Sequence, residues 1–205
     1  MIDFDVVERA DVTREPFPFF VASEVLQTGE LDAVRADMCD ISKPGIFPLS
    51  ALSYGPAFAR LVEDIQSPEL RDIMAAKFDV DLSACPLMIT VRGRARKKDG
   101  RIHNDSETKV VTCLLYLNDT WDDDQGRLRM LRGPDDLDDY IAEVPPHGGT
   151  LASFRRSDNS WHGHEPFVGE RRYVMFNWMT SAEAAAHELS RHRLSARLKR
   201  LNPFA

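Results

Sequence analysis

The chain has 205 residues, of which 43% are hydrophobic and 29% charged, and its formal net charge is -7 at pH 7. This composition is typical of a folded globular domain and excludes a disordered tail, a collagen-like chain and a disulfide scaffold. The acidic balance argues against a nucleic-acid partner. No run of 18 apolar residues exists that could serve as a membrane span, so we expect no membrane association.

The N-terminus and the cysteines indicate the compartment. The first residues are acidic, whereas a signal peptide begins with basic residues. The three cysteines lack the spacing Cys-x-x-Cys, and their odd number suits reduced thiols. We therefore expect a cytoplasmic protein.

Residues 1–85 are predicted to form a helical support region. Apolar spacing suggests a helix over roughly residues 29–41 and a second one along 58–65. Ser67 and Pro68 then have the character of an N-cap and a first helical position, so a third helix is expected to follow them.

Residues 86–180 have a different character. Short β-branched or aromatic runs alternate with turn-rich stretches, with no helical pattern between them. This predicts an antiparallel barrel or a two-sheet jelly roll, within a single domain over 1–205. Residues 181–205 are predicted to form a C-terminal helix, which is a candidate contact for a homodimer.

Two histidines and one aspartate form the candidate metal site. His103 and Asp105 are two residues apart, just before the predicted strand at 109–117, so in an extended segment they point to the same side. His162 can supply a third ligand from a neighbouring strand, with His164 as the alternative. Two histidines and one carboxylate on one face of a metal leave the opposite positions open, as in non-haem Fe(II) sites.

Two adjacent arginines follow these histidines on a predicted strand. A dicarboxylate co-substrate that chelates the metal needs a cation at its far end, and arginine offers a bidentate one. By strand alternation, Arg172 shares its face with apolar residues at 174, 176 and 178, whereas Arg171 shares its face with a more polar set. The more apolar face is predicted to point inward, so Arg172 is chosen and Arg171 is the alternative.

In these motifs the sequence resembles the Fe(II)/2-oxoglutarate-dependent oxygenases, of the prolyl-hydroxylase-like bacterial type. The resemblance runs from about Arg101 to Trp178 and keeps the family's motifs in order. They are the H-x-D of RIHND, the YLNDTW run, QGRLRML, PPHGGTLASF, and the stretch from SWHGHEP to the RRY of the last strand.

The resemblance implies a fold, a reaction and roles for particular residues. The fold is a double-stranded β-helix (jelly roll, cupin-like), mainly β with flanking helices. His103, Asp105 and His162 are implied to bind iron, Arg172 to bind the distal carboxylate of 2-oxoglutarate, and Tyr116 to contact the co-substrate carboxylate. The implied cofactors are Fe(II), 2-oxoglutarate and O₂, with ascorbate as a candidate reductant. The implied reaction is a hydroxylation that also gives succinate and CO₂.

The substrate is expected to be a small molecule or a peptidyl group that enters past the loops around 43–56 and 92–100. Arg92 and Arg94 precede the metal loop and favour an anionic substrate, with His164 as a further candidate contact.

Two functions of other classes stay open. One is a non-redox metal-binding jelly roll, such as an isomerase or a sensor, and the other is a catalytically silent interaction module. An inward arginine about ten residues after the last ligand argues against the first, because a simple metal site needs no such cation. The complete ligand set argues against the second.

Overall fold

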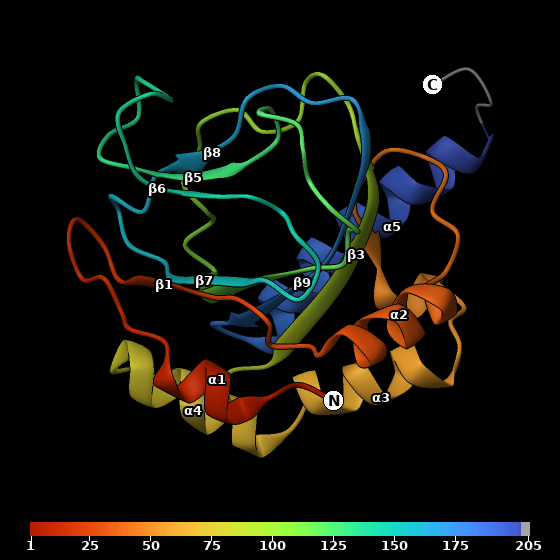
Figure 1. Cartoon of the computed structure of the whole chain (residues 1–205), viewed down its shortest axis with the longest axis horizontal. Coiled ribbons are helices and arrows are strands. Elements are labelled where there is room, and N and C mark those ends of the chain that lie inside the picture. Colours follow the sequence, from red (N-terminus) through yellow and green to blue (C-terminus); the bar gives the residue numbers. More distant parts are fainter. Residues whose placement is uncertain (202–205) are drawn as a thin grey trace.

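Two antiparallel β-sheets form the centre of the fold, in a computed structural model that describes residues 1–201 and the side chains of residues 1–192. The large sheet has the strand order β1-β7-β4-β9-β3-β2, and the small sheet has the order β6-β5-β8. Figure 1 shows the small sheet lying above the large one. The strands are β1 Phe19–Ala22, β2 Phe47–Pro48, β3 Leu87–Ala95, β4 Lys109–Tyr116, β5 Leu128–Leu131, β6 Tyr140–Val144, β7 Leu151–Arg155, β8 His162–Gly163 and β9 Gly169–Met179.

The central strands β3, β4 and β9 are buried on both faces. One face of the large sheet packs against helices, through residues such as Val174 and Phe176. The opposite face turns toward the small sheet, through residues such as Leu114 and Tyr173. Strands covered on both sides have nearly continuous apolar sequences, and β3, β4 and β9 follow this pattern. The predicted jelly roll, mainly β with flanking helices, is confirmed.

Helices cover the outer face of the large sheet, below it in Figure 1. Helix α3 begins with Pro56 at its first turn, and α4 is capped by Ser67, whose side chain accepts a hydrogen bond from the Leu70 amide at 3.1 Å. Both predicted helices are confirmed. The helix expected over 29–41 ends earlier, because Met38 has extended backbone angles. The helices are α1 Phe4–Arg9, α2 Thr28–Asp37, α3 Pro56–Ile65, α4 Pro68–Phe78 and α5 Ala182–Leu201, with a 3-10 turn at Leu49–Ala51.

Two strands come from the region that was predicted to be helical. β1 pairs with β7 at one edge of the large sheet, and β2 pairs with β3 at the other edge. They have four and two residues, respectively. Runs this short carry little periodic signal, so the sequence does not reveal that the predicted helical support region 1–85 also supplies these two edge strands.

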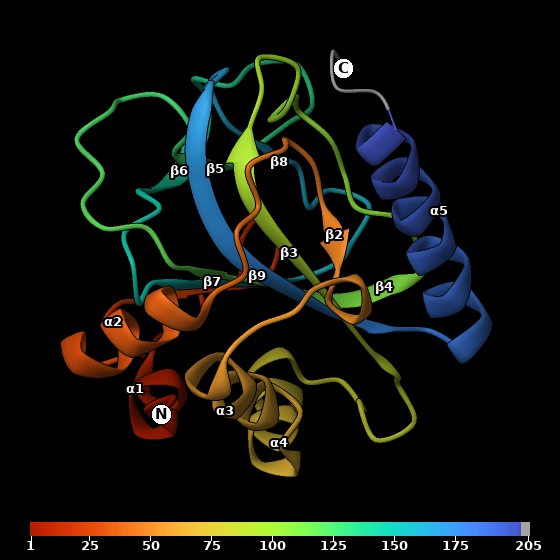
Figure 2. The same ribbon diagram turned by 90° about the vertical axis from the view of Figure 1, so that its right-hand side faces the viewer.

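The C-terminal helix α5 runs along the side of the barrel next to β2, β3 and β9 (Figure 2). Residues 202–205 of the predicted helix 181–205 lie outside the described residues. No described helix has the length and apolar character needed to cross a membrane. Cys39, Cys85 and Cys113 are free thiols, as expected.

Candidate active site

A cavity of about 150 Å³ lies between the two sheets. Residues of β3, β4 and β9 line it from the large sheet, and residues of β5 and β8 line it from the small sheet. Ile46 and the loop at Asp99 and Gly100 complete the wall. The predicted entry segments 43–56 and 92–100 thus both contribute to this cavity.

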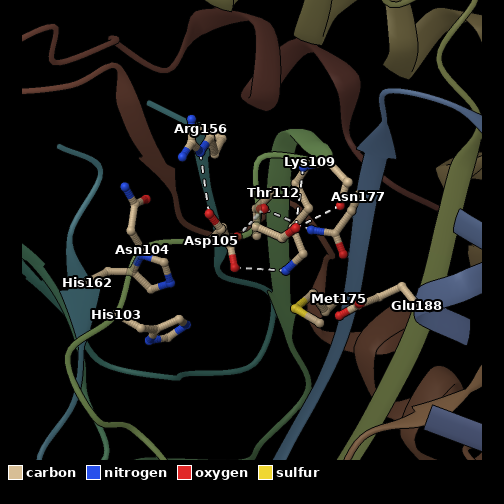
Figure 3. Close-up of polar contacts among 12 residues, drawn as sticks. His103, Asn104, Asp105, Lys109, Thr112, Arg156, His162, Met175, Asn177 and Glu188 are labelled. Atoms are coloured by element: carbon tan, nitrogen blue, oxygen red, sulfur yellow. Dashed lines mark hydrogen bonds and ion pairs between the residues drawn. The ribbon is translucent and has the colours of Figure 1, made fainter. Parts of the chain in front are cut away.

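His103, Asp105 and His162 meet in the cavity. One potential ligand atom of each lies within 4.8 Å of those of the other two, and together they form a group that could hold a metal ion. An antiparallel bridge between His103 and His162 brings the β8 strand beside the loop that precedes β4. The two imidazole centroids are 4.2 Å apart, and Figure 3 shows both rings on one side of Asp105. The predicted ligands are therefore gathered in one place.

Backbone carbonyls orient both imidazoles. The Nδ1 of His103 lies 2.9 Å from the carbonyl oxygen of Arg101, and the Nδ1 of His162 lies 3.0 Å from that of Ser160. Because a carbonyl only accepts hydrogen bonds, each Nδ1 carries the proton, and each Nε2 keeps its lone pair for a metal. Burial lowers the pKa of His162 to about 4, which keeps it in the neutral form that metal binding requires.

Donors on the other side hold the carboxylate of Asp105. The ammonium of Lys109 donates to Oδ1 at 2.8 Å, and the hydroxyl of Thr112 donates to Oδ2 at 2.6 Å (Figure 3). The amide of Asn177 donates to the Thr112 oxygen at 2.8 Å, which directs the Thr112 proton toward Asp105. Burial acts to raise the pKa of Asp105, but the charge of Lys109 and these hydrogen bonds hold it well below its usual range.

Lys109, Thr112 and Asn177 are not among the site residues that the sequence predicts. The sequence does hold a signal for them, because each is a polar residue of a largely apolar strand: Lys109 begins β4, Thr112 lies within β4, and Asn177 lies within β9. The donor set of two imidazoles and one oriented carboxylate fits a divalent metal of the Fe(II) type.

His164 does not join the metal cluster of the described residues. It lines the cavity instead, and its Nδ1 lies 2.7 Å from the carbonyl oxygen of Glu165. Burial, together with the nearby charge of Arg171, lowers the pKa of His164 to about 3. This geometry favours His162 over His164 as the third ligand.

The prediction that Arg172 points into the barrel is wrong. Its side chain is 36% exposed and pairs with Glu170 at 2.9 Å. Arg171 is 2% exposed and lines the cavity. The Nε of Arg171 donates to the carbonyl of Gly126 at 2.9 Å, and its terminal nitrogen donates to the Tyr116 hydroxyl at 3.3 Å.

The two buried faces of β9 explain this error. The more apolar face, with Val174, Phe176 and Trp178, packs against the helices. The face with Tyr173 and Met175 turns toward the small sheet, where the polar site lies. The rule that the more apolar face points inward fails here because the interior of the barrel is a cavity with polar lining residues, whereas the main core lies under the helices.

Tyr116 is fully buried and contacts the guanidinium of Arg171. Burial raises the pKa of Tyr116, which keeps its hydroxyl protonated and able to donate. Its predicted contact with a co-substrate stays a prediction.

Arg92 and Arg94 lie in different environments. Arg92 is buried and lines the cavity, whereas the Arg94 side chain is 41% exposed and lies 3.9 Å from Glu170. The pairing of β3 with β9 shifts register between the two arginines, which breaks the alternation that would put them on one face. The structure therefore does not place Arg94 at the cavity as predicted.

The fold is a jelly roll, and its cavity brings together two histidines and one carboxylate that could hold a single metal ion. Residues 93–180 match the sequence profile described as "2OG-Fe(II) oxygenase superfamily". No match to a curated protein is found. The segment 93–180 of the chain is therefore similar to the 2OG-Fe(II) oxygenase superfamily.

Solved structures share the fold at low sequence identity. A Pseudomonas putida prolyl-4-hydroxylase is 17% identical with a TM-score of 0.56, and the match covers 78% of this chain and 91% of that one. HygX from Streptomyces hygroscopicus, with nickel and 2-oxoglutarate bound, is 17% identical with a TM-score of 0.52, over 78% and 81% of the chains. The viral collagen prolyl hydroxylase of Paramecium bursaria Chlorella virus-1 is 14% identical with a TM-score of 0.56, over 80% and 96%. The fold is of the prolyl-hydroxylase-like type.

Proposed function

We propose that this chain binds Fe(II) through His103, Asp105 and His162, binds 2-oxoglutarate through Arg171, and hydroxylates a small-molecule or peptidyl substrate. The observation that carries the proposal is the buried guanidinium of Arg171. Its hydrogen bonds go to a carbonyl and a phenol, and it has no carboxylate partner among the described residues. A buried cation without a counter-ion is costly, so a bound carboxylate in the same cavity as the metal ligands would be stabilising.

Different residues of the site would bind the metal, bind the co-substrate and exclude water. The three ligands would hold the metal on one face and leave the opposite positions open. Arg171 would hold the distal carboxylate of 2-oxoglutarate, with Tyr116 orienting the guanidinium. Leu114, Leu128 and Met175 line the same cavity and would keep water from the reacting groups. Bound iron with 2-oxoglutarate supplies O₂-dependent oxidation coupled to decarboxylation of the co-substrate.

A succinate-release assay tests the proposal. Protein loaded with Fe(II) is incubated with 2-oxoglutarate and O₂, with a panel of peptides and small metabolites added one at a time. We expect succinate that depends on iron and on 2-oxoglutarate, increased by at least one compound of the panel, which mass spectrometry then shows to have gained one oxygen atom.

This assay, together with a measurement of metal and 2-oxoglutarate binding, separates the two alternatives. A non-redox metal protein would bind the metal but form no succinate with any compound. A silent interaction module would hold neither the metal nor 2-oxoglutarate. Either result contradicts the proposed hydroxylase.

A further inference from the structure

A second buried arginine lies beside the proposed 2-oxoglutarate anchor. Arg92 of β3 is 8% exposed, and its guanidinium carbon lies 5.7 Å from the centroid of the Tyr173 ring. The guanidinium carbon of Arg171 lies 5.3 Å from the same centroid. Two cationic groups thus lie next to one aromatic ring, and both line the cavity. This gives the cavity two neighbouring positions for anions.

The charge of Arg92 is only partly compensated. Its guanidinium pairs with Asp99, but the same carboxylate also accepts a hydrogen bond from the backbone amide of Arg96 at 3.1 Å and lies 3.5 Å from the Arg96 guanidinium. The Nε of Arg92 is buried and has no hydrogen-bond partner among the described residues. The Asp99 carboxylate is therefore shared between two arginines, and the Nε–H of Arg92 can donate one further hydrogen bond.

The charges of the residues that line the cavity favour the binding of one further anion. Among the described lining residues, Arg92, Lys109 and Arg171 are cationic, and Asp99 and Asp105 are anionic, so the cations exceed the anions by one. Fe(II) and the two carboxylates of 2-oxoglutarate carry equal and opposite charges. The loaded site would therefore keep one positive charge, which a monoanionic substrate would neutralise.

A larger cavity next to the first has the same electrostatic character. Its volume is about 450 Å³, and it shares Asp99, Gly100 and His164 with the first cavity. Lys97, Lys98 and Arg101 also line it. Three basic residues against one carboxylate favour the approach of an anion.

We infer that the Arg92 side of the cavity is a subsite for a carboxylate group of the substrate. This inference rests on the proposed function, because it assigns 2-oxoglutarate to Arg171. A planar carboxylate matches the guanidinium fork, and its single charge matches the excess in the cavity. The enzyme would thus act on an organic acid, or on a peptidyl group next to a carboxylate, and Arg92 would hold that group beside the metal.

Acetate can probe the subsite without knowledge of the whole substrate. The protein is loaded with Mn(II), a redox-inert paramagnetic substitute for Fe(II), and with saturating 2-oxoglutarate. The relaxation of the acetate methyl protons is then measured, with acetamide as the neutral probe of similar shape and with ionic strength held constant. We expect the bound metal to enhance acetate relaxation at least fivefold more than acetamide relaxation.

Variants identify the group that binds acetate. Arg92→Gln should abolish the difference between acetate and acetamide, and Arg92→Lys should keep part of it because the charge remains. Arg94→Gln changes an exposed arginine two residues along the same strand and should behave as the wild type. If Arg92→Gln fails to fold, the Arg92→Lys and Arg94→Gln variants still separate a charge at position 92 from surface charge.

Each outcome bears on the inference. Equal relaxation of acetate and acetamide in the wild type would overturn it, as would an acetate effect that survives Arg92→Gln, since acetate would then lie on the metal itself. A loss of 2-oxoglutarate binding in Arg92→Gln, but not in Arg171→Gln, would show that Arg92 is the co-substrate anchor. The proposed function fails separately, if 2-oxoglutarate itself is not relaxed by the bound Mn(II).

Discussion

Asp105 depends on its neighbours for its orientation. Lys109 holds one carboxylate oxygen and Thr112 holds the other, while Asn177 fixes the direction of the Thr112 hydroxyl. Partners that orient a ligand commonly matter almost as much for metal affinity as the ligand itself. The two proposed histidine ligands are oriented in the same way, by the carbonyls of Arg101 and Ser160.

Thr112→Val should weaken Mn(II) binding by about tenfold to a hundredfold. The substitution removes the hydrogen bond to Asp105, while the valine side chain has almost the same shape as threonine. Thr112→Ser keeps the hydroxyl and should bind within about threefold of the wild type, which is well under the tenfold that 1.4 kcal/mol represents. Electron paramagnetic resonance titration of Mn(II) into folded protein measures both. Equal affinities of the valine and serine variants would show that Thr112 does not orient the ligand.

Asp99 should make the stability of the fold depend on pH. Burial acts to raise its pKa, but the charges and hydrogen bonds of Arg92 and Arg96 lower it below the ordinary value of 3.8. A lowered carboxylate pKa stabilises the folded state fully above the ordinary value, and this stabilisation is lost as the pH falls through the lowered pKa. Asp99→Asn should therefore be less stable than the wild type at pH 7, and the difference should shrink toward pH 3.

Urea unfolding at a series of pH values measures this difference. Asp135→Asn, at an exposed carboxylate, is the control and should show a small difference that changes little with pH. A stability difference between Asp99→Asn and the wild type that grows toward pH 3 would contradict a stabilising interaction of Asp99 with Arg92 and Arg96.

At the scale of elements, β9 shows where prediction from sequence succeeds and where it fails. Its motifs predict the strand, and they also point to the proposed metal ligand before it and to the pair of arginines. They were not sufficient to choose between Arg171 and Arg172, because both faces of β9 are buried and the functional face is the more polar one. Similarly, the pairing of β1 and β2 depends on distant partners that no local pattern reveals.

Gly100 fixes the loop between β3 and the metal ligands. Its φ is +88°, which favours glycine, and a Cβ built on it would overlap the imidazole of His164. Gly100→Ala should cost about 1–2 kcal/mol from the backbone alone and should also displace His164 from the cavity wall. Gly133→Ala, where a Cβ meets nothing within 4 Å, should change stability by less than about 0.5 kcal/mol.

Thermal unfolding compares these two glycine variants. A Gly100→Ala protein as stable as Gly133→Ala would contradict the tight approach between this loop and His164.

At the scale of the whole molecule, the large sheet separates two buried regions. The helices pack on its outer face around residues such as Phe58, Leu61 and Phe176, while the cavity lies on the inner face. Stability and binding can therefore be changed separately. Helix α5 contacts β2, β3 and β9 of its own chain. The homodimer through this helix stays a prediction.

Leu61→Ala removes a fully buried side chain from the layer of helices. The large sheet lies between this layer and the cavity with the proposed metal ligands. The substitution should lower the free energy of unfolding by about 2–5 kcal/mol. Val168→Ala, at a side chain that is 69% exposed, should change it by less than about 0.5 kcal/mol. Mn(II) affinity of the folded Leu61→Ala protein should match the wild type, and a tenfold loss would show that the two regions are coupled.

The central claim is that one cavity holds Fe(II) on His103, Asp105 and His162 and 2-oxoglutarate on Arg171. Anaerobic titration of 2-oxoglutarate into the Fe(II)-loaded protein tests it most directly, through the visible absorption band that forms when a 2-oxo acid chelates Fe(II). We predict a saturable band in the wild type, at least a tenfold weaker apparent affinity in Arg171→Gln, because each charged hydrogen bond is worth about 1.5–3 kcal/mol, and no change in Arg172→Gln. No band in the wild type, or equal effects of the two substitutions, would contradict the account.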